Sequence, residues 1–118
     1  MIKALVNNSW KLFDINELQP GTSVFNFETG LYETIRTRDH RPILLTPHLD
    51  RLFSSAKSTR LIPSYHRKKV ESMIMQVIES SPEADQRVRV LLVPDKVIIF
   101  TMPLDLDYDI YNGVSVIT

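Results

Sequence analysis

The period of the hydrophobic pattern changes between residues 38 and 49. Over residues 31–38 the side chains alternate, with Leu31 and Ile35 on one side of an extended chain and Arg36 on the other. This alternation predicts a strand. Apolar residues at 49, 52, 53 and 56 then follow the helical spacing i, i+3, i+4, i+7 and form one face of a helix. A strand followed so closely by an amphipathic helix indicates a sheet with a helix packed against it.

Further strands are expected on both sides of this unit. Apolar runs bounded by turn residues predict strands at 2–6, 10–13, 22–27, 31–38, 43–45, 87–93 and 96–102. Asn7 and Asn8 tolerate positive φ and are expected to turn the first pair of strands. Residues 39–42 are expected to form the turn between the strands at 31–38 and 43–45.

Two helices are expected in the middle of the chain. Thr46 is the expected N-cap of the first helix and Pro47 its first helical residue, and Pro63 ends the segment. Ser64 is the expected N-cap of the second helix. One face of the second helix is apolar, at Val70, Met73, Ile74, Val77 and Ile78. The order of strands, two helices and strands predicts an α+β fold, a two-layer domain with an antiparallel sheet and two helices on one face.

The composition narrows the class of protein. The chain has 118 residues, enough for one domain, and its fourteen basic residues balance fourteen acidic ones. Neither nucleic acid nor a membrane is therefore an expected partner. The absence of cysteine excludes disulfides and agrees with a reducing cytoplasm, where we expect the protein. The three histidines lack the spacing of metal ligands, so no metal is expected.

Arginines on and near the strand–helix unit are candidates for binding an anion. Arg51 lies one turn after the helix start, where free N–H groups and the helix dipole favour an anion, and a guanidinium can grip a phosphate with two hydrogen bonds. Arg36 and Arg89 lie within strands, where a fixed fork could bind a carboxylate. Tyr32 offers an aromatic wall. The alternative is structural: a surface arginine paired with Asp50 or another neighbour, solvent-facing strand positions, and a tyrosine that fills the core.

Two segments carry a resemblance to a known family. Residues 30–36 read Gly-Leu-Tyr-Glu-Thr-Ile-Arg, and residues 48–56 read His-Leu-Asp-Arg-Leu-Phe-Ser-Ser-Ala. They resemble the "G-hydrophobic-[FY]-E-x-[IVL]-R" strand and the "H-L-x-R-L-x-x-S-A" helix of class IV aminotransferases. These fold-type IV pyridoxal-phosphate enzymes include branched-chain and D-amino-acid aminotransferases and 4-amino-4-deoxychorismate lyases. The resemblance implies that residues 1–103 form the N-terminal small domain, and that 104–118 form an interdomain linker and the first strand of a missing large domain.

The resemblance also implies roles for single residues. Arg51 would bind the phosphate of pyridoxal 5′-phosphate, the cofactor of the complete enzyme. Tyr32, Arg36 and Arg89 would lie near the substrate, with Arg87 as a competing match for the last of these. His48 matches the helix motif and is a further candidate for substrate binding, although its role varies between members of the family.

The resemblance finally implies what the chain lacks. None of its six lysines lies in the motif of the family's Schiff-base lysine, so no catalytic residue is expected here and the chain alone is expected to be inactive. The complete enzyme would act on an amino acid or amino-chorismate, as a homodimer. Within the family, the sequence of residues 30–36 favours the aminodeoxychorismate-lyase-like group. The alternative is a non-catalytic, stand-alone ligand-binding or protein-interaction module that kept this fold.

Overall fold

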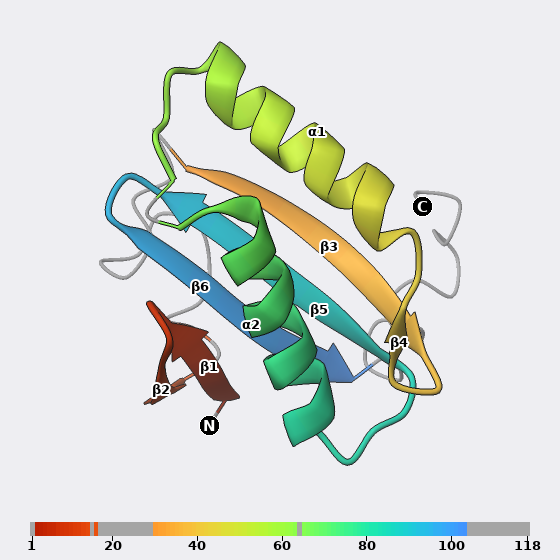
Figure 1. Cartoon of the computed structure of the whole chain (residues 1–118). Coiled ribbons are helices and arrows are strands. Elements are labelled where there is room, and N and C mark those ends of the chain that lie inside the picture. Colours follow the sequence, from red (N-terminus) through yellow and green to blue (C-terminus); the bar gives the residue numbers. More distant parts are fainter. Residues whose placement is uncertain (1, 15, 17–29, 64, 104–118) are drawn as a thin grey trace.

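The described residues form a six-stranded antiparallel sheet with two helices on one face. The computed structural model describes residues 2–14, 16, 30–63 and 65–103. The elements, in chain order, are β1 (Ile2–Val6), β2 (Ser9–Phe13), β3 (Leu31–Arg38), β4 (Arg41–Pro42), α1 (Leu45–Ser58), α2 (Arg67–Ser80), β5 (Gln86–Val93) and β6 (Lys96–Pro103). The strand order is β2-β1-β6-β5-β3-β4, and both helices lie in front of the sheet in Figure 1. The expected α+β fold is confirmed.

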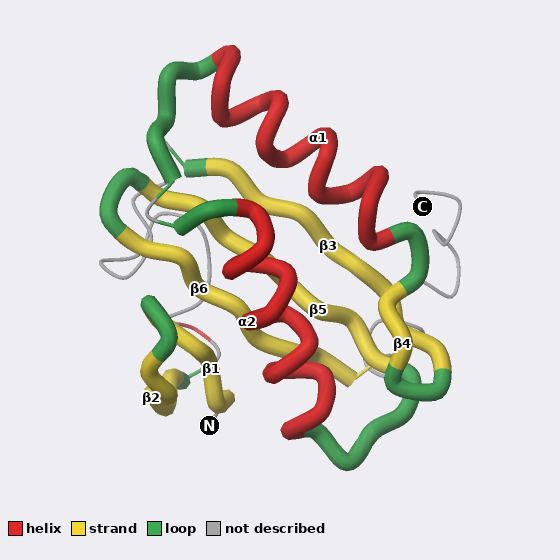
Figure 2. Tube along the Cα trace, viewed as in Figure 1, coloured by secondary structure: helices red, strands yellow, loops and turns green. Residues whose placement is uncertain are grey.

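The main core lies between the helices and the sheet. Figure 2 shows α1 over β3, at one side of the sheet, and α2 over the central strands. The five apolar residues predicted for one face of α2 are all buried in this core, as are Leu49, Leu52 and Ala56 of α1. Sheet residues of alternating number meet them: Leu5, Ile35, Val88, Val90, Leu92, Val97 and Ile99. The helical spacing of apolar residues in the sequence therefore predicted which face of each helix packs on the sheet.

A second apolar cluster lies on the opposite face of the sheet. Its buried members are Ala4, Val6, Leu91, Ile98 and Phe100. Strand β6 contributes to both clusters, since Ile98 and Phe100 point away from the helices while Val97 and Ile99 point toward them. This explains why the sequence over 97–100 is continuously apolar rather than alternating.

The connection from β3 to α1 differs from the prediction. Asp39 and His40 both have positive φ, 52° and 60°, and form a tight two-residue turn instead of the expected turn over 39–42. The return strand is therefore β4, which pairs only with the last two residues of β3, and the predicted strand at 43–45 is wrong.

The first helix begins earlier than predicted. Its N-cap is Leu44, which has a left-handed backbone with φ 56°, and the amide of His48 donates to the carbonyl oxygen of Leu44 at 3.1 Å. Thr46 is thus not the N-cap, and Pro47 lies within the first turn rather than at its first position. No side chain caps this end of α1.

The second helix begins later than predicted. Its N-cap is His66, whose carbonyl oxygen accepts hydrogen bonds from the amides of Lys69 and Val70. Ser64 is therefore not the cap, and it lies outside the described residues, as do the predicted strand at 22–27 and the segment 104–118. In the described part of the chain, neither helix has the length and apolar character needed to cross a membrane.

Candidate functional site

Strand β3 divides the predicted site residues into two groups. Ile35 is buried toward the helices, so Glu33 points to the same side, whereas Tyr32 and Arg36 point to the opposite face and are exposed. Helix α1 lies over β3 on the helix side, as Figure 1 shows. The candidates on α1 therefore meet Glu33, and the candidates of the sheet gather on the other face.

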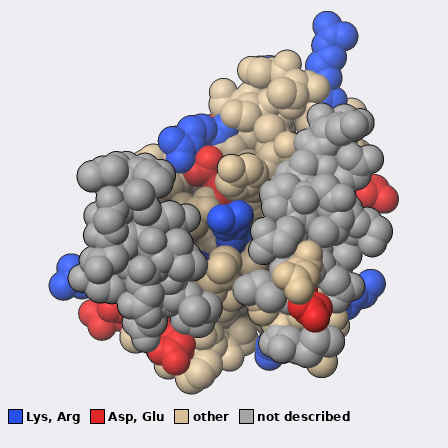
Figure 3. Space-filling model, turned by 180° about the vertical axis from the view of Figure 1, so that it is seen from behind, with Lys and Arg blue, Asp and Glu red and all other residues tan. Residues whose placement is uncertain are grey.

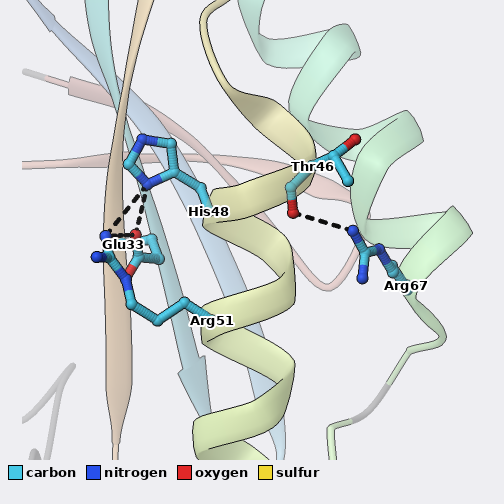
Figure 4. Close-up of polar contacts among 5 residues, drawn as sticks. All are labelled: Glu33, Thr46, His48, Arg51 and Arg67. Carbon is cyan, nitrogen blue, oxygen red and sulfur yellow. Dashed lines mark hydrogen bonds and ion pairs between the residues drawn. The ribbon is translucent and has the colours of Figure 1, made fainter.

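Glu33, His48 and Arg51 form a hydrogen-bonded cluster between β3 and α1. His48 Nδ1 lies 2.6 Å from Glu33 Oε1. Arg51 donates from Nε to Oε2 at 3.0 Å and from Nη2 to Oε1 at 2.6 Å. Figure 4 shows both helix side chains reaching from α1 to the carboxylate on the strand. The motif strand and the motif helix are thus joined by direct side-chain contacts.

The contact between Glu33 and His48 fixes the proton on one ring nitrogen. An ionised carboxylate only accepts hydrogen bonds, so Nδ1 of His48 must carry the proton that it donates to Glu33. Arg51 Nη2 lies 3.4 Å from the same Nδ1. Because a protonated Nδ1 has no lone pair to offer, Arg51 approaches the ring closely there without a second hydrogen bond.

The two donors keep the Glu33 carboxyl group ionised. Its side chain is 10% exposed, and this burial by itself raises the pKa of Glu33. Hydrogen bonds from Arg51 and His48, together with their positive charges, outweigh the burial and leave the pKa below its ordinary value of 4.5. The hydrogen bond to Glu33 in turn raises the pKa of Arg51, so the guanidinium remains charged.

Tyr32 and Arg89 meet on the other face of the sheet. The guanidinium carbon of Arg89 lies 5.5 Å from the centroid of the Tyr32 ring, within the range of a cation–π contact. Arg36 is paired in register with Arg87, and Arg38 lies on the same side of β3, so four arginines share this face of β3 and β5. Figure 3 shows this side of the molecule, where the surface of a basic side chain is visible near the centre. The structure thus brings Tyr32 and Arg89 into contact and places Arg36 on the same face.

The two groups are separated by the thickness of one strand. Tyr32 and Glu33 are neighbours in β3 and point to opposite faces. Strand β4 pairs only with Thr37 and Arg38, so no other described strand pairs with this edge of β3 beside Tyr32 and Glu33.

Glu33 is the residue of the cluster that sequence reasoning did not select. A signal for it was present, because Glu33 occupies an inward position of the alternating strand between Leu31 and Ile35. A carboxylate that is buried at such a position requires hydrogen-bond or charged partners. The periodicity could therefore have indicated that Glu33 has a partner, although not which one.

A second arginine–carboxylate cluster joins the two helices. Arg67, at the start of α2, donates to the Asp50 carboxylate, to the carbonyl oxygen of Thr46 at 3.1 Å and to Glu71 at 3.4 Å. Asp50 is therefore not the partner of Arg51, since it pairs with Arg67, but Arg51 is an exposed arginine paired with another residue, Glu33, as the alternative allowed. Figure 4 shows Arg67 on the far side of α1 from Glu33.

No described lysine takes part in the ion pairs of either cluster. All six are within the described residues, and none is buried: Lys96 is half-buried, and the others are exposed at 3, 11, 57, 68 and 69. A lysine that forms a Schiff base usually needs a pKa depressed by burial. Nor do His, Asp and Glu side chains of the described residues gather in any group of three that could hold a metal ion.

A groove of about 450 Å³ lies at the start of β3. Its lining includes Gly30 and Leu31 from the motif strand, Arg60 and Ile62 from the segment after α1, and Pro94 from the β5–β6 turn. None of the predicted site residues lines this groove. The groove is therefore separate from the Glu33 cluster and from the group of Tyr32, Arg36 and Arg89.

Comparisons with known proteins agree with this architecture. A branched-chain amino acid aminotransferase from Escherichia coli has a TM-score of 0.70 at 21% identity, and the match covers 86% of this chain and 41% of that one. The enzyme from Thermoproteus uzoniensis with norvaline gives 0.66 at 19% identity over 86% and 40%. A third branched-chain enzyme, complexed with N-(5′-phosphopyridoxyl)-L-glutamate, gives 0.66 at 17% identity, also over 86% and 40%. At these identities the likeness shows a shared fold.

The match to a family model goes further than the fold. The chain spans about two fifths of the length of the solved structures that it matches. No curated protein sequence matches it. The model described as "Amino-transferase class IV" matches residues 30–106, which is more than half of the chain and includes both motifs. The chain therefore belongs to the class IV amino-transferase family.

Proposed function

We propose that this chain is the small-domain part of a pyridoxal-phosphate-dependent enzyme and that Arg51 holds the phosphate of the cofactor. The observation that carries the proposal is that Arg51 is both hydrogen-bonded to Glu33 and open to solvent. Its guanidinium is fixed from one side by Glu33, and its side chain is 66% exposed. A charged fork that is held in place yet open to solvent is suited to grip a phosphate. A structural relative complexed with a phosphopyridoxyl compound supports the choice of ligand.

The residues of this chain fit the phosphate end of the cofactor only. When bound, the cofactor supplies an electron sink for reactions at the substrate's amino-bearing carbon. The half-buried or exposed lysines do not provide the buried amine that covalent attachment requires. We therefore propose that a lysine outside these 118 residues provides the attachment, and that the chain alone has no turnover.

The opposite face of β3 is proposed to meet the substrate. The substrate is an amino acid or an amino-chorismate, and either carries a carboxylate. Arg89 is half-buried and stacked on Tyr32, and Arg36 is exposed on the same face. Guanidinium groups on a rigid sheet are well placed to bind a carboxylate. The complete enzyme would transfer or eliminate the amino group of this substrate. His48 would contribute through its second ring nitrogen, since Nδ1 already donates to Glu33.

The proposed assembly is a homodimer in which other protein surface covers part of this domain. Several large apolar side chains are exposed: Trp10, Leu12, Ile43, Leu44 and Ile62. Exposed apolar surface of this kind is a common mark of an interface. Light scattering that shows a strict monomer at high concentration would count against this association.

We place the protein in the cytoplasm, for which a chain without cysteine is suited.

The test compares two ligands that differ by one phosphate. Pyridoxine 5′-phosphate and pyridoxine both lack the aldehyde, so neither reacts with the exposed lysines. We expect equilibrium dialysis to show tighter binding of the phosphorylated ligand, and we expect Arg51→Ala to remove this preference. Arg67→Ala is the matched control, because it removes an arginine that is also paired with a carboxylate, that of Asp50 on α1, and it should keep the preference.

Two outcomes would change the conclusion. A preference for phosphate that survives Arg51→Ala would exclude Arg51 as the anchor. Inorganic phosphate that binds as tightly as pyridoxine 5′-phosphate would favour the alternative, a non-catalytic module that binds anions and does not recognise the pyridine ring.

A further inference from the structure

Glu33 has a charged side chain at a position that faces the core. Leu31 and Ile35 precede and follow it on the same side of β3, and its side chain is 10% exposed. A buried carboxylate requires partners that satisfy its oxygens. All of its hydrogen bonds described above come from α1, from His48 and Arg51. The carboxylate therefore links the motif strand to the motif helix.

The contact with Arg51 uses one side of the guanidinium. A guanidinium has five N–H groups, and the pair with Glu33 takes the one on Nε and one of the two on Nη2. Of the three N–H groups that remain, one on Nη1 and the second one on Nη2 point the same way and form the end-on edge of the fork. This edge can hold a second anion with two parallel hydrogen bonds while Glu33 stays bound. Phosphate and Glu33 therefore need not compete for the same donors.

The contact also limits the freedom of Arg51. An arginine side chain that is 66% exposed loses much rotamer freedom when it binds a ligand. Glu33 lies on a strand that is hydrogen-bonded to β5 over 31–36, so it offers a rigid anchor. His48 holds Oε1 of the same carboxylate and so restrains its orientation. A guanidinium that is ordered before a ligand arrives binds the ligand at a lower entropic cost.

We propose that Glu33 is a positioning residue for the anion site. Its carboxylate holds Arg51 side-on, directs the end-on edge of the guanidinium toward the ligand, and remains bound to Arg51 after the ligand arrives. The inference rests on the proposed function, because the ligand group is the phosphate that Arg51 is proposed to bind. It gives the glutamate of the motif strand a role in that site although Glu33 does not touch the ligand.

The experiment uses the 118-residue chain with inorganic phosphate as the probe. NMR of ¹⁵N-labelled protein follows the Arg51 Nε–H signal, which should be visible and protected before phosphate is added. Phosphate should shift the Nη signals of Arg51 and leave the Nε–H signal in place. Glu33→Gln should broaden the Nε–H signal and raise the dissociation constant for phosphate by roughly 3- to 10-fold, the effect of one side chain that is no longer ordered in advance.

The weaker phosphate binding expected for Glu33→Gln is the opposite of what charge repulsion alone predicts. Removing the negative charge of Glu33 from beside the site would, through Coulomb repulsion alone, strengthen the binding of phosphate. Only a positioning effect that exceeds this repulsion weakens it. Asp50→Asn is the matched control, because it neutralises a carboxylate next to Arg51 in sequence that pairs with Arg67 instead, and it should leave the dissociation constant unchanged.

The outcomes separate this inference from the proposed function. If phosphate does not shift the Arg51 signals, or binds equally to Arg51→Ala, the proposed function fails and the inference fails with it. If phosphate binds through Arg51 but binds Glu33→Gln equally or more tightly, only the positioning role is overturned. A change in the ¹³C signal of the Glu33 carboxylate that shows loss of Arg51 on adding phosphate would also overturn it. This last measurement uses the unchanged chain and does not depend on the folding of any variant.

Discussion

Helix α1 takes part in two arginine–carboxylate clusters that differ in which partner is buried. In the first, the Glu33 side chain is 10% exposed and that of Arg51 is 66% exposed. In the second, the Asp50 side chain is 61% exposed and that of Arg67 is 34% exposed. The first cluster therefore has a buried anion and an open cation, and the second has an exposed anion and a more enclosed cation.

This difference decides what each arginine can do. All three nitrogens of Arg67 donate to acceptors of the protein, and these contacts tie α2 to the start of α1. Arg51 commits Nε and Nη2 to Glu33, and within the described residues its Nη1 makes no hydrogen bond. The Arg67 cluster therefore joins the two helices, whereas the Arg51 cluster leaves one edge of a charged guanidinium unused by the described residues, the edge that we propose binds a phosphate.

The largest loss of stability is expected from a substitution in the core between α1 and the sheet. Leu49 is fully buried on α1, next to His48 and Asp50 in sequence. Leu49→Ala leaves a cavity, and we expect it to lower the free energy of unfolding by about 2–5 kcal/mol, measured by urea unfolding. It should also weaken both clusters, since each depends on the position of α1.

An exposed aliphatic residue provides the control for this variant. Ile62 is 82% exposed, so we expect Ile62→Ala to change the free energy of unfolding by no more than about 0.5 kcal/mol. Equal effects of the two substitutions would mean that α1 does not pack on β3 as described.

A smaller effect should appear in the pH dependence of stability. Burial raises the pKa of Glu33, but the hydrogen bonds and charges of Arg51 and His48 exceed this effect, so the pKa in the folded chain is below its ordinary value of 4.5. The stabilisation by the ionised form is therefore complete above pH 4.5 and is lost as the pH falls through the lower pKa of the folded state.

The variant Glu33→Gln isolates this contribution. We expect it to be less stable than the unchanged chain at about pH 6, and we expect the difference in the free energy of unfolding to close as the pH falls below 4.5, since a protonated carboxyl resembles an amide. Urea unfolding at a series of pH values measures the gap. A gap that stays constant over this range would show that Glu33 is not held ionised by its partners.

The fold could be predicted to the extent that burial determines the sequence pattern. The alternation over β3 and the helical spacing in α2 both record which side chains face the core, so the inward faces followed directly. The start of α1 did not follow, because Leu44 takes a left-handed backbone that leucine has no intrinsic preference for. The tight turn at Asp39 and His40 and the packing of α1 determine that conformation, and the local sequence alone does not show them.

The candidate site shows the same division. The residue types on the strand and the helix identified Arg51 and His48 as candidates and placed Tyr32 and Arg36 together on one side of β3. The pairing of Glu33 with residues 15 and 18 positions later depends on how closely α1 lies over β3, which no short-range pattern records. The contact between Arg89 and Tyr32 likewise depends on the register of β3 with β5. The roles of these residues in binding remain predictions that the dialysis and NMR experiments address.

The smallest expected effect is that of Asp50→Asn, and it tests the comparison most directly. Asp50 is more exposed than Glu33, so water and salt already screen much of its attraction to Arg67. We expect the variant to lose less stability at about pH 6 than Glu33→Gln does, and the loss should shrink further in high salt, whereas the loss in Glu33→Gln should depend less on salt because its carboxylate is buried. Urea unfolding of both variants at low and high salt measures this. An Asp50→Asn effect that equals or exceeds that of Glu33→Gln and resists salt would mean that burial of the carboxylate does not distinguish the two clusters.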